Sequence, residues 1–60
     1  MGIDEAIAQF RAAIAVQPGN AEAHYNLGLA FRQEGKNAES QHELAKAYEL
    51  EPELKSLPLP

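Results

Sequence analysis

The chain opens with apolar residues that recur every three or four positions, which is the spacing of one face of a helix. The residues on this stripe are Ile3, Ile7, Phe10 and Ile14. Pro18 and Gly19 follow, and proline both lacks an amide proton and disfavours helical geometry in the residue before it. The pattern predicts an amphipathic helix over residues 3–17 and a tight turn over residues 17–20.

A second helix is predicted over residues 21–34. Asn20 comes directly before it, and an asparagine side chain can accept a hydrogen bond from the free amides of a first helical turn. Gly35 comes directly after it, where the left-handed conformation that often ends a helix costs glycine little. The two residues therefore mark the start and the end of this helix.

A third helix is predicted over residues 38–51, with Asn37 as its N-cap and Pro52 as its stop. Two prolines among the last three residues disfavour regular helix, so residues 53–60 predict a frayed or extended tail. The Leu-Pro-Leu-Pro sequence at 57–60 also suits docking in a groove as an extended segment.

Small and large residues follow a fixed order through the second and third predicted helices. The positions that carry this order are His24, Leu27, Gly28 and Phe31, then Ser40, Leu44, Ala47 and Pro52. The order large-x-x-Leu-Gly-x-x-aromatic, small-x-x-x-large, Pro resembles the 34-residue tetratricopeptide repeat (TPR), a helix-turn-helix unit. A shift by 34 residues places Pro18 on Pro52. The chain thus resembles one and a half repeats: the second helix of a partial repeat plus a turn (1–20), a complete repeat (21–54) and an irregular C-terminal tail (55–60).

This resemblance implies an all-α fold of antiparallel helix-turn-helix units, a three-helix segment of a right-handed superhelix. In the family, the first helix of each pair lines a concave face that binds a peptide or a helix. The residues that would point into that groove here are Glu22, Tyr25, Asn26, Leu29, Arg32 and Gln33. Their helical spacing agrees with a second stripe, although Tyr25 and Leu29 would share that spacing if they only packed on a neighbouring helix. Tyr25 and Leu29 stand where the carboxylate clamp of some members has lysine and asparagine, so we expect no such clamp.

Residue size follows the packing of a helical hairpin. Gly28 and Ser40 are small where two helices must come close, and larger residues surround that contact. His24 departs from the family, which usually has tryptophan or another large apolar residue at this position. A buried imidazole needs partners for its ring nitrogens, so we expect looser packing in the first turn of the second helix.

Charge and hydropathy narrow the classes of partner. The chain has five basic and nine acidic residues, a net charge of −4, and its basic residues are spread along the sequence, which argues against nucleic acid. No apolar run approaches the length of a membrane span, and the acidic start does not resemble a signal peptide. We therefore expect a protein or peptide partner and, by default, a cytoplasmic location.

The sequence offers little for metal binding or catalysis. It has no cysteine, and His24 and His42 form neither an i, i+4 pair nor a His-Glu-x-x-His arrangement, so no metal or other cofactor is predicted. The acidic residues from Glu43 onward predict a solvated face. No nucleophile with a base beside it and no glycine-rich phosphate loop is present, so we expect a non-enzyme.

Apolar faces that this chain does not itself cover suggest an alternative role in assembly. Stacked repeats bury such faces on their neighbours. The candidates for self-association are Ile3, Ile7, Phe10, Ile14, Tyr48, Leu50 and Leu54. The chain is thus interpreted as an interaction module, with homo-oligomerisation, including exchange of helices between copies, or a place in a longer repeat array as alternatives. A substrate-holding segment of a larger enzyme is a third hypothesis.

Overall fold

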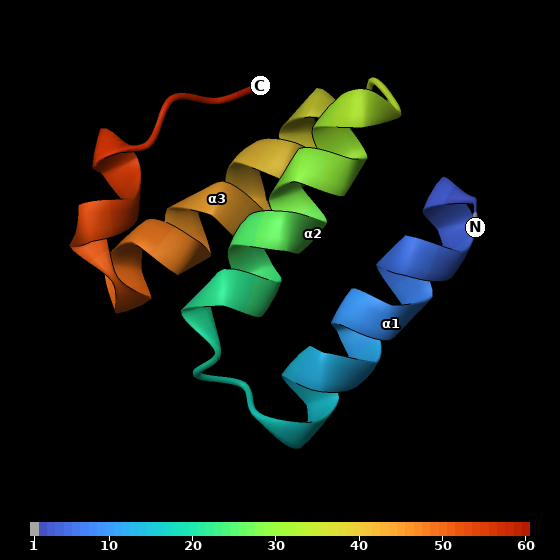
Figure 1. Cartoon of the computed structure of the whole chain (residues 1–60), viewed down its shortest axis with the longest axis horizontal. Helices are drawn as coiled ribbons and strands as arrows, with labels where there is room; N and C mark the ends of the chain where they lie inside the picture. The colour runs from blue at the N-terminus through green and yellow to red at the C-terminus, as the bar shows by residue number, and fades with distance from the viewer. Residues whose placement is uncertain (1) are drawn as a thin grey trace.

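Three α-helices and one short 3-10 helix make up the fold in the computed structural model, which describes residues 2–60. The elements are α1 (Ile3–Val16), α2 (Ala21–Gln33), α3 (Asn37–Leu50) and the 3-10 helix η1 (Pro52–Ser56). Helix α2 lies between α1 and α3, and η1 packs beside α3 (Figure 1). Within the described chain, α1 and α3 make no contact with each other. The expected all-α, helix-turn-helix fold is confirmed.

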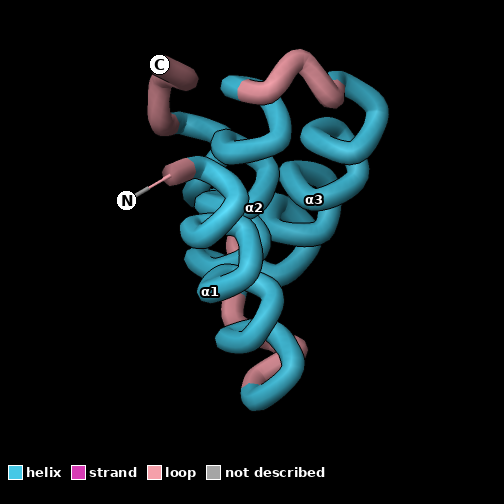
Figure 2. The backbone as a smooth tube through the Cα atoms, turned by 90° about the vertical axis from the view of Figure 1, so that its right-hand side faces the viewer, coloured by secondary structure: helices cyan, strands magenta, loops and turns pink. Residues whose placement is uncertain are grey.

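Short loops join the helices, as the side view in Figure 2 shows. The start of α1 and the C-terminal end of the chain lie toward the same end of the molecule in both views. The chain therefore returns, after three helices, to the end of the molecule from which α1 sets out.

The predicted signals around α2 are confirmed in atomic detail. The Asn20 side chain accepts a hydrogen bond from the Ala23 amide at 3.0 Å, which caps the first turn. Gly35 has φ +79°, and its amide donates to Arg32 O at 3.0 Å. The Lys36 amide donates to Phe31 O at 2.9 Å, which completes a Schellman motif at the end of α2.

The prediction that Asn37 caps α3 is wrong. Asn37 is the first residue of α3, and Lys36 holds the capping position without a side-chain hydrogen bond. The cause is that Lys36 takes part in both helix ends. Its amide closes the Schellman motif of α2, and its carbonyl accepts the first hydrogen bond of α3, from the Ser40 amide at 2.9 Å. No residue remains between the two helices in which a separate asparagine cap could sit.

The predicted irregular tail is only partly correct. Pro52 ends α3 but stands in the first turn of η1, where its missing amide proton costs nothing. The 3-10 helix closes when the Leu57 amide donates to Leu54 O at 3.2 Å, and the Ser56 hydroxyl donates to Glu53 O at 2.7 Å. Residues 57–60 have no regular structure.

The core consists of two apolar clusters that meet on α2. The first contains Ile7, Leu27, Ala30 and Phe31, with Ile3, Phe10 and Ile14 packed against it. The second contains Tyr25, Leu44 and Ala47, with Leu29, Tyr48 and Leu54 packed against it. Helix α2 contributes to both clusters, so it forms the centre of the core.

The close approach of α2 and α3 occurs at Gly28, as its size predicts. A Cβ atom at this position would lie 2.8 Å from Leu44 Cγ and 3.3 Å from the Leu44 backbone nitrogen. The Ser40 hydroxyl crosses the same contact and donates to Gly28 O at 2.7 Å. With Leu44 opposite, only a residue without a side chain lets these two helices come this close.

Candidate functional site

The structure places the six predicted groove residues on α2 at three depths. Glu22, Arg32 and Gln33 are exposed, while Asn26 and Leu29 are half-buried. Tyr25 is only 8% exposed, because its ring packs among residues of α3 and is tilted at 57° against the Tyr48 ring, with the ring centroids 6.5 Å apart. Tyr25 therefore packs in the core, which is the alternative to a groove role that its helical spacing also allowed.

A hollow of about 390 Å³ lies between α1 and the C-terminal half of α2. Its walls are Gly2, Ile3, Ala6 and Phe10 on the side of α1, and Asn26, Leu29, Ala30 and Gln33 on the side of α2. Ile3 and Phe10 are two of the self-association candidates that the sequence predicts. The structure adds them to the surface that Asn26 and Leu29 form.

A second hollow, of about 530 Å³, adjoins the first at Leu29 and Gln33. Arg32 and Pro60 complete its lining. After η1 the chain turns back toward α2 (Figure 1), and the Arg32 guanidinium donates a hydrogen bond from Nη1 to Pro60 O at 2.9 Å. The end of the tail therefore lies against the predicted groove.

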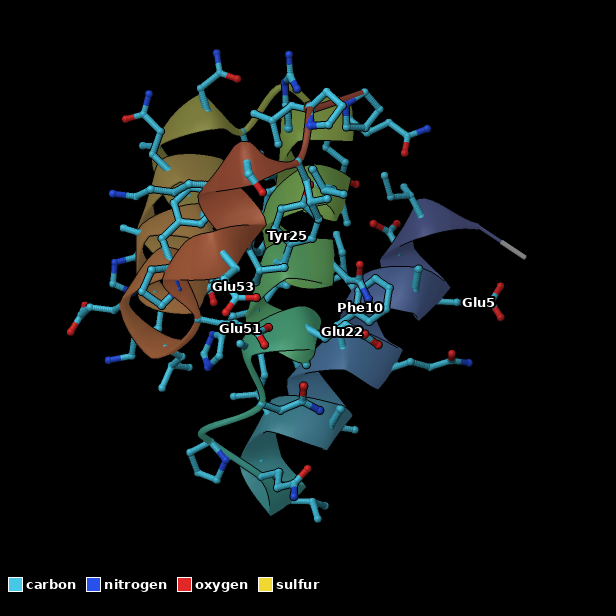
Figure 3. All side chains as sticks on the ribbon, turned by 60° about the vertical axis from the view of Figure 1, so that its left-hand side comes forward. Glu5, Phe10, Glu22, Tyr25, Glu51 and Glu53 are labelled. Atoms are coloured by element: carbon cyan, nitrogen blue, oxygen red, sulfur yellow. The ribbon has the colours of Figure 1, made fainter. Side chains whose placement is uncertain are left out.

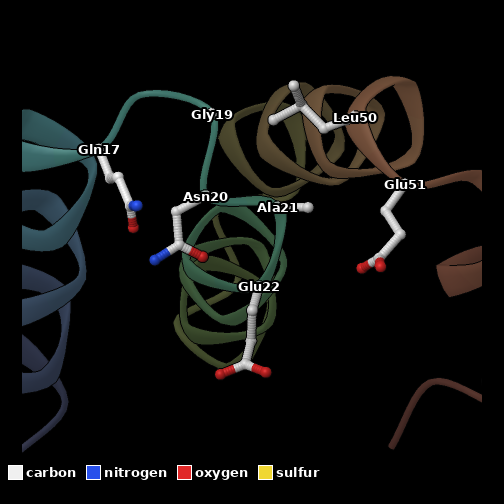
Figure 4. A pocket seen from close by; sticks show the side chains of 7 residues that line it. All are labelled: Gln17, Gly19, Asn20, Ala21, Glu22, Leu50 and Glu51. Carbon is white, nitrogen blue, oxygen red and sulfur yellow. The ribbon is translucent and has the colours of Figure 1, made fainter.

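A third hollow, of about 490 Å³, lies at the N-terminal end of α2 and is polar. Glu22 and Glu51 both line it, and their carboxylates extend to the same side (Figure 4). In Figure 3, Glu53 lies on this side of the molecule as well. The α2 face thus runs from carboxylates at one end to a guanidinium at the other, about 15 Å apart along the helix.

Of the seven self-association candidates, Ile7 is buried and Leu50 is exposed, with 7% and 44% of their surfaces accessible. The other five are half-buried against the two core clusters. Val16, which the sequence interpretation did not single out, is 86% exposed at the end of α1. Val16 comes two residues after Ile14, and residues at that spacing lie on different faces of a helix, so it does not belong to the stripe.

His24 is 7% exposed, and both of its ring nitrogens have partners. Nδ1 lies 2.8 Å from Glu43 Oε1, and Nε2 lies 2.9 Å from Pro18 O. Both neighbours are oxygen atoms within hydrogen-bond distance, so neither ring nitrogen is left without a partner. The prediction of loose packing in this turn is wrong, because Glu43, which the sequence predicts on a solvated face, turns inward to meet the imidazole.

Residues 2–60 hold no candidate for two other kinds of site. No three His, Asp or Glu side chains in this range gather closely enough to hold a metal ion. No helix within it combines the length and apolar content that crossing a bilayer requires.

Two protein-family models match the chain. One, described as TPR repeat, covers residues 3–35, and the other, described as tetratricopeptide repeat, covers residues 21–54. The chain belongs to the tetratricopeptide repeat family. TPR domains are generally protein–protein interaction modules and are typically non-catalytic. Comparison with curated proteins and with solved structures gave no match.

Proposed function

We propose that this TPR segment binds an extended peptide of another protein along α2. The surface consists of Glu22, Asn26, Leu29, Arg32 and Gln33, with Ile3 and Phe10 of α1 as its side wall, and is called the α2 surface below. The observation that carries the proposal is the hollow of about 390 Å³ that Asn26, Leu29 and Gln33 share with Phe10. Apolar and amide side chains face the same space there.

The chemistry of the α2 surface suits a peptide backbone with alternating side chains. Leu29 and Phe10 supply apolar area, and the amides of Asn26 and Gln33 can both donate and accept hydrogen bonds. About 15 Å separate its two charged ends, which an extended chain of four or five residues spans.

Charge sets the expected direction of the peptide. Glu22 and Glu51 favour a basic residue at the N-terminal end of α2, whereas Arg32 favours a carbonyl or carboxylate acceptor at the other end. The net charge of −4 adds a long-range preference for basic partners.

The test is selection of peptides from a displayed random library, followed by binding measurements on variants of the chain. Leu29→Ala is expected to weaken the selected peptides about tenfold, because it removes the central apolar contact. Asn26→Ala is expected to weaken them as well. Gln41→Ala, at an exposed position of α3, is the control and should leave affinity unchanged.

Two results would contradict this function. One is a library that yields no peptide above background, and the other is equal binding by Leu29→Ala and Gln41→Ala. Tyr25→Ala is unsuitable for this test, since Tyr25 belongs to the core and its loss would disturb the fold.

Assembly with other copies is a second candidate function, favoured by the exposure of two apolar side chains. Val16 is 86% exposed and Leu50 is 44% exposed, and each is the last residue of its helix. The discriminating experiment is light scattering coupled to size exclusion on the intact chain and on Val16→Ser/Leu50→Ser. A dimer that this double variant abolishes supports assembly, whereas a monomer at micromolar concentration rejects it.

A further inference from the structure

We propose that residues 57–60 are an internal ligand of the α2 surface, and that the partners of this surface are extended, proline-rich apolar segments of the same kind. This inference rests on the proposed function, because it names the class of peptide that the same surface accepts. An external segment that binds at Leu29, Arg32 and Gln33 must therefore first displace the tail.

The position of the tail is set by the contacts of η1, which packs beside α3 and against the second apolar cluster. Leu54 packs against the cluster of Tyr25, Leu44 and Ala47, and the Lys55 ammonium lies 5.9 Å from the centroid of the Tyr48 ring. Leu57 then takes an extended conformation, with φ −79° and ψ 132°. Because η1 is fixed on α3, residues 57–60 leave it in a defined direction, back toward α2 (Figure 1).

At α2 the tail meets a side chain that can only donate hydrogen bonds. Arg32 Nη1 donates to Pro60 O at 2.9 Å, and Pro60 shares the hollow of about 530 Å³ with Leu29 and Gln33. Proline offers a carbonyl and no amide proton, so a proline-rich segment presents acceptors to a guanidinium without a competing donor.

The tail reaches this hollow at Pro60 without joining the core. Leu57 and Leu59 keep 48% and 41% of their surfaces exposed, and neither belongs to an apolar cluster. Proline also restricts the unbound chain to extended conformations, so docking such a segment costs little conformational entropy. A segment held by one exposed hydrogen bond, with only Pro60 in the lining of the hollow, should be readily displaced.

The experiment compares the intact chain with a chain that ends at Leu57. This truncation removes residues 58–60 but keeps the Leu57 amide, whose hydrogen bond to Leu54 O closes η1. The probe is an N-acetylated, C-amidated peptide of sequence Ser-Leu-Pro-Leu-Pro, and the readout is the NMR signals of the Leu29 methyl groups and the Gln33 side-chain amide. Truncation should shift these signals, and the peptide should shift them back.

Competition gives the second measurement. A tail at an effective concentration of about 1 mM competes with the peptide, so if tail and peptide bind with a Kd of about 0.5 mM, the peptide should bind the truncated chain about threefold more tightly than the intact chain. Arg32→Gln in the truncated chain should weaken the peptide, while Lys46→Gln, which removes the same charge from an exposed position of α3, should not.

The proposal is overturned if truncation leaves the Leu29 and Gln33 signals unchanged, or if the peptide binds both chains equally. Either result is separable from failure of the proposed function. Peptides selected from the library would still lose affinity for Asn26→Ala, whose position lies outside the hollow that Pro60 lines.

Discussion

Buried His24 on α2 and half-buried Glu43 on α3 form a pair, with Nδ1 of the imidazole 2.8 Å from Oε1 of the carboxylate. The other ring nitrogen meets Pro18 O, so one side chain joins the α1–α2 turn, α2 and α3. The family usually fills this position with a large apolar residue, and here a hydrogen-bonded imidazole occupies the same volume.

We expect the contributions of His24 and Glu43 to the free energy of unfolding to be coupled. Glu43→Ala should lower the free energy of unfolding by about 1–3 kcal/mol, because it leaves a buried ring nitrogen without its partner. In a His24→Leu background the same change should cost much less. Urea denaturation of the four proteins measures the coupling, with Glu39→Ala at an exposed position of the same helix as the control. Equal costs of Glu43→Ala in both backgrounds would contradict the pair.

The effect of Gly28→Ala on stability should change sign when Leu44 is replaced by alanine. In the native background the new Cβ would lie 2.8 Å from Leu44 Cγ and 2.9 Å from Leu44 Cδ2, so overpacking should destabilise the chain by about 1–3 kcal/mol. In a Leu44→Ala background those two atoms are gone, and alanine is the better helix former by about 1 kcal/mol. Thermal unfolding should therefore show Gly28→Ala as destabilising in the first case and neutral or stabilising in the second. The same loss in both backgrounds would show that the contact is not the cause.

The two glycines in loops between helices should respond differently to alanine. Gly35 has φ +79°, which alanine adopts only at a cost of about 1 kcal/mol, so Gly35→Ala should lower the melting temperature. At Gly19 the φ is not positive and a Cβ would meet no atom within 4 Å, so Gly19→Ala is the matched control and should be close to neutral. Gly35→Asn should fall between them, since asparagine tolerates the left-handed region.

Asn20, which caps α2, and Asn37, the first residue of α3, make a second matched pair. Asn20→Ala removes a side-chain cap and should cost about 1 kcal/mol of stability. Asn37→Ala lies inside α3 and removes no capping bond, so it should be neutral or slightly stabilising. Circular dichroism with chemical denaturation measures both, and equal losses would show that Asn37 does act as a cap.

Local patterns predicted most of the backbone. The predicted bounds of the three helices lie within one residue of the observed ones, because Pro18, Asn20, Gly35 and Pro52 each act on their own neighbours in sequence. The start of α3 is close to its predicted place although its predicted cap, Asn37, is wrong. The close contact at Gly28 was also predictable, since a 34-residue repeat fixes which small residues face each other.

Contacts between distant residues were not predictable in the same way. Glu43 is 19 residues from His24, and no periodicity in α3 distinguishes a carboxylate that turns inward from one on a solvated face. Tyr25 lies on the predicted stripe, but Tyr48 packs against its ring and Leu54 covers the same cluster. Leu54 belongs to η1, in a stretch whose prolines pointed to an irregular tail, so its part in burying Tyr25 had no sequence signal.

The separation of α1 from α3 has a consequence for how the chain opens. Helix α1 is held by one neighbour, whereas α2 has a neighbour on each side. Thermal fluctuation should therefore peel α1 away as a unit while the α2–α3 hairpin persists, and amide hydrogens in α1 should exchange with solvent sooner than those at the Gly28 contact. In that partly open form the ring of Phe31 would be exposed to solvent, and the chain would briefly present an apolar surface that is buried in its closed form.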